Sequence, residues 1–541
     1  MACEHRMRVL FLLALALSAR AQNVSIDKIF SAQDGKDAPG CSLVVTRAGK
    51  TIYTHGYGMA DLDHDIPITA SNVFHVASIS KEFTAASILI LEQEGKLSID
   101  DDIHKYIPEL PDFGVKITLR HLLHHSSGMR DQWSLLGLAG WRLNLDLITD
   151  QDVLDILSRQ KALNFRPGEE YLYSNSGYTL LAITVKRASG KSIRQFTQER
   201  LFAPLGMTHT FFRDNHGEIV KQQAYGYVTV GKTFEFRVPQ FDTAGATSLL
   251  TTADDFGKWM ANFDDPRVEP KVIAKMQDRG HFNSGAPMDY AFGLQPGIFR
   301  GLPIIGHGGA DAGYRADFLR FPEDQLSIGC LCNLGSLNPR DLTKQVAEVY
   351  LSGKMAPAPK PATAPASAAA VPENALGLFY NRDLGDVRRI ARRQGKVMLY
   401  SPGPRWEEIM DPSGADWSLA NAAGTVTLES GRITEKRPGA APAVYERRAE
   451  AARTDLAAYA GVYRSEELDT SYEVRLRDGK LSLKRRKFAE AAMTPTLDDC
   501  FLVRVDGPEA HLVFHRDAAG RVTGFDLNAG RVRHLEFKRG A

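Results

Sequence analysis

A serine and a lysine three residues apart, Ser78 and Lys81, open an apolar run in the stretch HVASISKEFTAASILILEQEG. A serine hydroxyl is a weak nucleophile, and it needs a base for its proton and donors for the oxyanion that forms. Side chains three residues apart share one helical face, so a helix beginning here brings the pair together. Burial of the lysine would favour its neutral, basic form, and the helix N-terminus would direct N–H groups at negative charge. The alternative is an ordinary helix start, with Ser78 or Ser80 as N-cap and Lys81 in solvent.

Two later segments carry groups that complement such a pair. Tyr173 and Asn175 follow a Pro-Gly turn in FRPGEEYLYSNSGY, where a phenol could move a proton and an amide could hold a carbonyl group. The alternative there is a structural tyrosine and a helix-capping asparagine. His307, Gly308 and Gly309 end an apolar strand in IIGHGGADAGY, and glycines let a backbone N–H approach a ligand closely. The alternative there is a loop histidine with two turn glycines.

The elements that must position these groups follow two patterns. A helical apolar period predicts helices at 80–94, 119–125, 152–159, 176–188, 193–202 and 253–263. Apolar alternation predicts strands in CSLVVTRAGKTIYTHGYGMAD, LPIIGHGG, YRADFLRFP and LSIGCLCNL. Strands at both ends with helices between them predict an α+β fold, in which a sheet of terminal strands is flanked by a helical region.

The chain changes character after residue 353. Residues 354–373 are rich in Pro and Ala, which predicts an extended linker. Short alternating strands follow, with a weak repeat: LGLFYNRDLGD resembles AGVYRSEELDT, and GKVMLY resembles GKLSLK at the same offset. We predict two small antiparallel β-barrels in tandem, at 374–450 and 451–541, with one larger lipocalin-like barrel as the alternative.

The N-terminal residues indicate the cellular location of the protein, and the composition limits its possible binding partners. Residues 1–21 have a positive start, a short apolar core and an Ala-Arg-Ala site, as in a cleavable signal peptide. This predicts a periplasmic or secreted protein, with no integral membrane segment after cleavage. The 66 Lys and Arg residues nearly balance 65 Asp and Glu residues, which argues against a nucleic-acid partner. Cys330 and Cys332 alternate in an apolar run, so we expect buried free thiols on one face rather than a metal site.

In this order and at these separations, S-x-x-K, Y-x-N and H-G-G resemble the motifs of the serine β-lactamase and penicillin-binding-protein superfamily. The resemblance covers residues 34–352, includes GYGMADLDHDIPIT and AGATSLLTTADDFGKW, and implies a β-lactamase-like hydrolase domain at 22–353. It implies that Ser78 is the acylated nucleophile and that Lys81 and Tyr173 share the general base and acid roles. Asn175 would hold the substrate amide, and the N–H groups of Ser78 and Ala310 would form the oxyanion hole.

The third motif departs from that pattern. Its usual lysine and threonine help to bind a substrate carboxylate, whereas His307 and Gly308 stand in their places and Gly309 keeps the glycine. An unperturbed histidine is mostly neutral at pH 7, so carboxylate recognition should be weak unless another residue supplies it.

D-stereospecific aminopeptidases of this superfamily carry H-x-G and two small barrels, and GHGGADAGYR and YRSEELDTSYEV resemble them. The resemblance implies an exported serine hydrolase, without metal or cofactor, that acts through an acyl-enzyme on small amides or peptides. A β-lactamase, a D-Ala-D-Ala carboxypeptidase, an esterase and a binding or sensor protein that retains the fold are the alternatives. The resemblance also implies that a loop of the last barrel restricts the active site, and we take residues 485–500, with Asp498 and Asp499, as the candidate.

Overall fold

The computed structural model describes residues 22–143, 145–358, 373–393, 396–400, 407–413, 416–419, 424–436, 442–452, 455–505 and 509–540. The predicted signal peptide and most of the predicted linker lie outside these residues. The chain divides into two compact units. The sheet unit contains the described residues up to 99 together with 178–280 and 290–358, and the barrel unit contains 100–177, 281–289 and the residues after 358.

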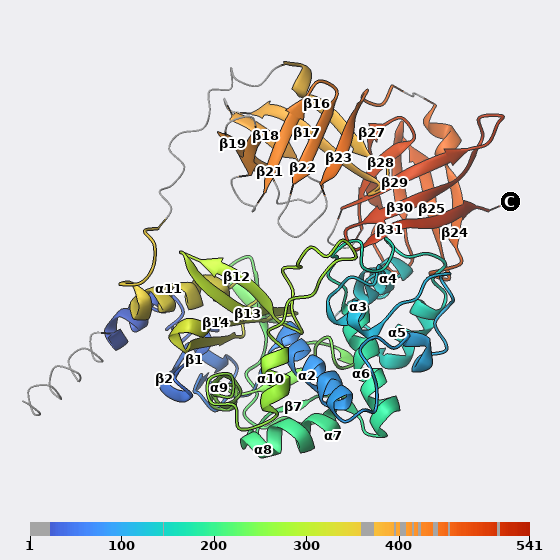
Figure 1. The fold of residues 1–541 in the computed structure, drawn as a ribbon. Helices are drawn as coiled ribbons and strands as arrows, with labels where there is room; N and C mark the ends of the chain where they lie inside the picture. Colours follow the sequence, from blue (N-terminus) through green and yellow to red (C-terminus); the bar gives the residue numbers. More distant parts are fainter. Residues whose placement is uncertain are drawn as a thin grey trace, which may run out of the picture. The chain divides into compact units, whose positions relative to one another are not determined.

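The sheet unit is built on a six-stranded antiparallel sheet with the order β12-β13-β14-β15-β1-β2 (Figure 1). The first and last segments of the unit therefore pair with each other, which confirms the α+β fold and the sheet of terminal strands. The strands are β1 (Cys41–Arg47), β2 (Lys50–Tyr57), β12 (Gln295–Phe299), β13 (Leu302–Asp311), β14 (Tyr314–Phe321) and β15 (Leu326–Cys332).

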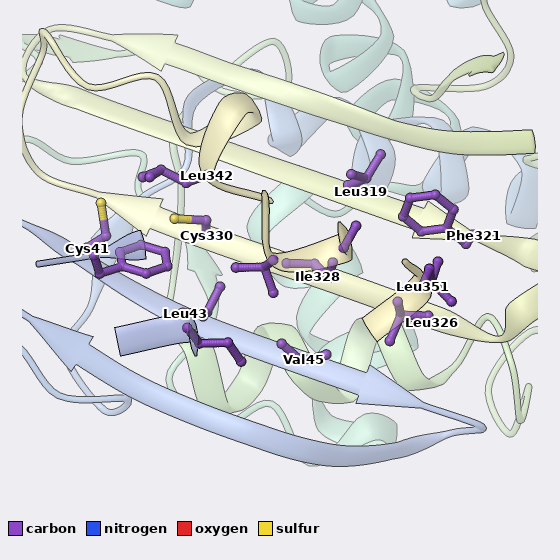
Figure 2. Close-up of a cluster of buried hydrophobic side chains, with 14 of the residues drawn as sticks. Cys41, Leu43, Val45, Leu319, Phe321, Leu326, Ile328, Cys330, Leu342 and Leu351 are labelled. Carbon is purple, nitrogen blue, oxygen red and sulfur yellow. The ribbon is translucent and has the colours of Figure 1, made fainter. Parts of the chain in front are cut away.

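Strand alternation gives this sheet two apolar faces. On one face, Leu43 and Val45 of β1 and Ile328 of β15 pack in a buried cluster with Leu342 and Leu351 of α11 (Pro339–Leu351), as Figure 2 shows. Helix α9 (Ala253–Ala261) packs on β1 and β15 as well. The central strands of the sheet are thus buried between helices.

The remaining elements of the sheet unit include α2 (Ser80–Gln93), whose residues from Ser80 to Leu91 are all buried. A helix that is buried all round belongs to the core. The other elements are η1 (Ala77–Ile79), α7 (Ile193–Thr197), η3 (Gln198–Phe202), α8 (Ala203–Leu205), α10 (Pro270–Lys275), η4 (Pro322–Asp324), β3 (Met59–Asp61), β4 (Ile66–Pro67), β5 (Phe74–His75), β7 (Phe211–Phe212), β8 (Tyr227–Val230), β9 (Thr233–Phe236), β10 (Phe241–Asp242) and β11 (Leu249–Thr251).

The barrel unit begins with a helical segment and continues into two closed barrels. The segment contains η2 (Ile103–Lys105), α3 (Leu119–Leu123), α4 (Gln132–Ala139), β6 (Ile148–Thr149) and α5 (Asp150–Ser158). The division between the units falls inside α6 (Asn175–Ser189), after Gly177. Among the described residues, no helix is both long enough and apolar enough to span a membrane.

Each barrel has eight antiparallel strands in sequential order, so the tail forms two small barrels and not one large one. The repeat seen in the sequence corresponds to this duplication, because β16–β18 recur as β24–β26 at a constant offset. The first barrel comprises η6 (Glu373–Ala375), β16 (Gly377–Asn381), β17 (Asp386–Arg393), β18 (Lys396–Tyr400), β19 (Glu407–Ser413), β20 (Asp416–Leu419), β21 (Thr425–Glu429), β22 (Arg432–Lys436) and β23 (Ala443–Arg448). The second comprises η7 (Leu456–Tyr459), β24 (Gly461–Ser465), β25 (Thr470–Arg477), β26 (Lys480–Lys484), β27 (Ala491–Leu497), β28 (Cys500–Arg504), β29 (Glu509–Arg516), β30 (Val522–Ala529) and β31 (Val532–Arg539).

The interpretation of residues 485–500 as one long loop is wrong. Residues 491–497 of the stretch form strand β27, whose small and polar residues obscure the apolar alternation. Asp498 and Asp499 form its turn into β28, and Asp499 accepts hydrogen bonds from Tyr459 Oη and Arg516 Nε, both at 2.8 Å. The Asp499 carboxylate therefore stabilises the barrel itself.

The expectation of free thiols is wrong for one cysteine of the alternating pair. Cys332 forms a disulfide with Cys41, and the two residues are direct partners in the register of β1 and β15. Cys330 and Cys500 are free and buried. Cys330 Sγ lies 3.6 Å from Cys332 Sγ, which confirms that both cysteines face the same side of the strand.

Candidate active site

The Ser78–Lys81 pair lies at a sharp entry into the buried helix α2. Ala77 has a φ of 49°, a left-handed conformation that costs a non-glycine residue about 1 kcal/mol and is typical of functional sites. Lys81 Nζ lies 3.2 Å from Ser78 Oγ, and the lysine side chain is fully buried. Neither η1 nor α2 has a side-chain N-cap, so the alternative of an ordinary capped helix start is wrong.

The segment before β11 fixes the position of Lys81. Lys81 Nζ donates a hydrogen bond of 2.6 Å to the carbonyl oxygen of Ala246. Thr84, one turn further along α2, donates to the carbonyl oxygen of Gly245 at 2.9 Å. Gly245 has a φ of 102°, which a side chain would strain, so the chain presents two successive carbonyl groups to one face of α2. The amine is thereby aimed at Ser78 Oγ.

Strand β13 passes beside this pair with its outer edge open. Strand β12 pairs only with Leu302–Gly306, so the edge from His307 to Asp311 carries no partner from β12. A Cβ atom on Gly309 would lie 2.2 Å from the carbonyl oxygen of Val76, just before η1. Both glycines of the third motif lie within the strand, and Gly309 is required for this close approach rather than for a turn. Ala310, the next residue, is exposed.

His307 is buried and neutral. Its Nδ1 donates to the carbonyl oxygen of Gly308 at 2.7 Å, so Nε2 is the acceptor for the hydroxyl of Tyr290 at 3.0 Å. Burial, reinforced by the positive charge of Lys81, lowers the pKa of His307 to about 3. His307 therefore cannot replace the missing lysine as a cation at pH 7.

A cation does lie beside the third motif, on helix α11. A Cβ atom on Gly308 would lie 3.5 Å from Nη2 of Arg340. Arg340 Nε donates to the buried carboxylate of Asp317 at 3.2 Å, and Nη2 donates to Gln295 Oε1 at 3.3 Å. About half of the Arg340 side chain is exposed, so its remaining donors face solvent. The guanidinium therefore lies within van der Waals reach of a side chain at position 308.

Tyr173 and Asn175 lie in the barrel unit, where buried Asp131 orients Asn175. The Asp131 carboxylate oxygen Oδ2 accepts hydrogen bonds from the backbone N–H and the side-chain amide of Asn175, both at 2.8 Å. Its other oxygen, Oδ1, accepts from the N–H groups of Trp133 and Ser134 and so caps α4. One carboxylate thus fixes both the start of α4 and the orientation of Asn175.

The ring of Tyr173 contacts a histidine and an arginine of its own unit. The His125 ring centroid lies 4.2 Å from that of Tyr173, and Cζ of Arg531 lies 4.8 Å from the Tyr173 centroid. His125 Nδ1 accepts a hydrogen bond from the backbone N–H of Ser174 at 3.2 Å, so it carries no proton and the imidazole is neutral. Arg531 is therefore the cation at this ring among these contacts.

In the part of the chain that the structure describes, the one cluster with metal-ligand geometry is Cys41, Cys330 and Cys332. Two of these sulfurs are consumed by the disulfide, which makes the cluster an unsuitable metal site.

Two protein-family models match the chain. A family model described as Beta-lactamase matches residues 26–350, and one described as a domain of unknown function, DUF3471, matches residues 446–539. The chain belongs to the beta-lactamase family. It is a serine hydrolase of that family, with Ser78 and Lys81 inside the matched region.

Relatives in this family extend the similarity into the barrels. The D-aminopeptidase of Brucella canis is 28% identical over 518 residues, which cover 93% of this chain and 96% of the relative. The D-amino acid amidase of Ochrobactrum anthropi SV3 has a TM-score of 0.54 at 24% identity, covering 62% of this chain and 99% of the amidase. The octameric penicillin-binding protein homologue from Pyrococcus abyssi has a TM-score of 0.55 at 21% identity, covering 87% and 99%. At these identities the two structures show the fold alone.

Several residues that contact the three motifs were not identified from the sequence. Tyr290, Arg340 and Asp131 contact motif residues from positions far away in the sequence or outside any motif. Of these three, only Asp131 has a recognisable local sequence pattern, because an aspartate directly before an apolar helix is a typical N-cap. Arg531 has none, since it lies in a short turn between two strands of the last barrel.

Proposed function

We propose that the protein hydrolyses the amide bond of small amides or peptides, with D-aminoacyl compounds as preferred substrates. The observation that carries the proposal is the fully buried Lys81 amine, 3.2 Å from a half-buried Ser78 hydroxyl at a strained helix entry. A lysine amine held at this distance from a serine hydroxyl is suited to accept the serine proton once it is neutral.

The proposed reaction has two steps. Ser78 Oγ attacks the substrate carbonyl and passes its proton to Lys81, while the N–H groups of Ser78 and Ala310 hold the oxyanion. The leaving amine takes a proton delivered by Lys81 and Tyr173, which leaves an acyl-enzyme ester on Ser78. Water then attacks that ester, the same groups take a proton from the water and give a proton to Ser78 Oγ, and the carboxylic acid product is released.

Substrate-binding roles are assigned to the remaining motif residues. Asn175 holds the amide of the substrate. The open edge of β13, with His307, Gly308 and Gly309, lies beside Ser78 and offers backbone hydrogen bonds to an extended substrate. The D-aminopeptidases that this chain resembles along most of its length support D-aminoacyl substrates.

A carboxylate-recognising activity, as in a D-Ala-D-Ala carboxypeptidase or a β-lactamase, is the second candidate. One observation favours it, namely that Arg340 lies beside Gly308 at the motif whose usual cation is absent. In either case we propose that the protein is exported. The Cys41–Cys332 disulfide supports export, because such bonds persist mainly in oxidising compartments.

A substrate panel tests the proposal. The purified mature chain is assayed with D- and L-aminoacyl p-nitroanilides, a D-alanyl-D-alanine peptide, a short-chain ester and a chromogenic cephalosporin. We expect the D-aminoacyl anilides to have the highest kcat/KM, and the Ser78→Ala variant to lose turnover and labelling by a fluorophosphonate. Preference for the D-Ala-D-Ala peptide or the cephalosporin would favour the second candidate, and labelling of Ser78→Ala would refute the nucleophile.

A further inference from the structure

The β30–β31 hairpin of the second barrel is fastened to the Tyr-x-Asn segment, and both belong to the barrel unit. The Asn164 side chain binds the hairpin at its turn and at the start of β31. Its Nδ2 donates to the carbonyl oxygen of Arg531 at 3.0 Å, and its Oδ1 accepts from the N–H of Arg533 at 2.8 Å. The backbone N–H of Asp131 also donates to the Arg531 carbonyl, at 3.4 Å. The backbone at Arg531 is therefore fixed beside the residue that orients Asn175.

A buried arginine secures the same hairpin from the helical segment. Arg130, which is almost fully buried, donates to the backbone carbonyl groups of Arg533 and His534 at 2.9 and 3.0 Å. Its Nη1 donates to the carboxylate of Glu467 in the second barrel at 2.6 Å. Leaving a buried charge unpaired is costly, so this ion pair favours one relative placement of the hairpin and the helical segment.

The side chain that this arrangement presents is the guanidinium of Arg531. Its Cζ lies 4.8 Å from the Tyr173 ring centroid, and its Nη1 lies 3.6 Å from Asp131 Oδ2. The side chain is 42% exposed, and none of the hydrogen bonds found among the described residues uses its guanidinium. The arginine therefore makes an electrostatic contact with Tyr173 and with Asp131, the residue that orients Asn175.

Tyr173 needs such a charge if it moves protons. A phenol that gives up its proton becomes an anion, and a nearby cation stabilises that anion. The neighbouring His125 is neutral, and Asp131 carries the opposite sign.

We propose that Arg531 is a positioning residue for Tyr173, carried into the catalytic apparatus by the second barrel. Its guanidinium holds the phenol ring and stabilises the negative charge that develops on the phenol oxygen during proton transfer. The inference rests on the proposed function, in which Tyr173 takes part in the proton transfers. The second barrel is then a component of catalysis, and not only of stability or attachment.

Three variants of Arg531 separate charge from packing. Arg531→Met keeps the length and removes the charge, and we expect kcat for the best substrate of the panel to fall about 10-fold with KM within about 2-fold. Arg531→Lys keeps the charge and should retain most of kcat. Arg531→Ala should regain activity when guanidinium ions are added at concentrations that leave the natural chain unaffected. Arg521→Met is the matched control, because Arg521 lies 80% exposed at the preceding turn of the same barrel.

A double-variant cycle with Tyr173→Phe identifies the partner of Arg531. Acylation is followed by the rate of fluorophosphonate labelling of Ser78, which remains measurable in slow variants. If Arg531 acts through Tyr173, Arg531→Met adds little to the loss in Tyr173→Phe. A full additional loss, or an unchanged kcat in Arg531→Met, would overturn the inference and leave the proposed function standing. An unchanged kcat in Tyr173→Phe would instead refute the proposed role of Tyr173, and the inference with it.

Discussion

Glu82 follows Lys81 on α2 and is a fully buried carboxyl group, which makes the stability of the fold depend on pH in an unusual direction. Its Oε2 accepts a hydrogen bond of 2.8 Å from the indole N–H of Trp259. Burial raises the pKa of Glu82 well above 4.5, and the negative charge of Asp317 raises it further. The folded protein therefore keeps a proton on Glu82 at pH values where the unfolded chain has lost it.

The sign and size of the effect follow from proton linkage. Above pH 4.5 the folded state binds more protons at this site than the unfolded state, so the free energy of unfolding falls as pH rises. The slope is about 1.4 kcal/mol per pH unit until the folded state also loses the proton. A glutamine at position 82 keeps the acceptor for Trp259 and has no proton to lose. Glu82→Gln should match the natural chain near pH 4.5 and exceed its stability by about 2–3 kcal/mol two pH units higher.

Urea unfolding followed by tryptophan fluorescence, at pH 4.5, 5.5, 6.5 and 7.5, measures this difference. Glu92→Gln is the matched control on the same helix, because Glu92 is partly exposed and pairs with Lys275 at the surface. The control should show no growing difference with pH. Parallel pH profiles for the natural chain and Glu82→Gln would mean that Glu82 is not protonated in the folded state, and would refute the reasoning.

Three further predictions concern the site and the core. Lys81→Ala should lower kcat by at least about 1,000-fold, because it removes the buried base. The control Lys161→Ala, which removes an exposed partner of Glu466, should lower kcat less than about 3-fold. Similar losses of kcat in both variants, measured in steady-state assays, would contradict the role of Lys81. Arg340→Gln should raise KM about 10-fold for substrates with a carboxylate on the leaving group, and it should leave KM for neutral amides unchanged. Equal changes in KM for both kinds of substrate would exclude carboxylate binding by Arg340. Cys41→Ser should lower the free energy of unfolding, measured in urea, by about 2–5 kcal/mol, because it removes the disulfide. A reductant should destabilise the natural chain but not this variant. Equal stability of the two chains without reductant would show that the disulfide does not stabilise the fold.

The local parts of the site could be predicted from the sequence because their geometry is set by short-range chemistry. A serine and a lysine three residues apart at the head of an apolar run meet on one helical face, and the structure confirms this for Ser78 and Lys81. The glycines of the third motif likewise signalled a close backbone approach, which Gly309 makes to Val76. The roles of Tyr173, Asn175 and Ala310 stay predictions.

Long-range pairs could not be predicted in the same way. Cys41 and Cys332 are direct neighbours only because the first and last strands of the unit pair in one particular register. The sequence shows that both segments are strands but contains no local signal for their register. Strand β27 was missed for a different reason, since its buried positions are few and its other residues are small or polar.

The third motif lacks its usual cation, and the surroundings of position 307 determine whether a substitution could restore it. From the sequence, a lysine at position 307 would restore carboxylate binding. In the structure that side chain is buried against Tyr290, near the charge of Lys81, so a second ammonium there would be desolvated and repelled. Within the sheet unit, the positive charge beside the third motif comes from Arg340 on α11. Within the barrel unit, the positive charge beside Tyr173 comes from Arg531 on the β30–β31 hairpin. We therefore expect that His307→Lys alone does not give an efficient cephalosporinase, because position 307 is buried beside the charge of Lys81.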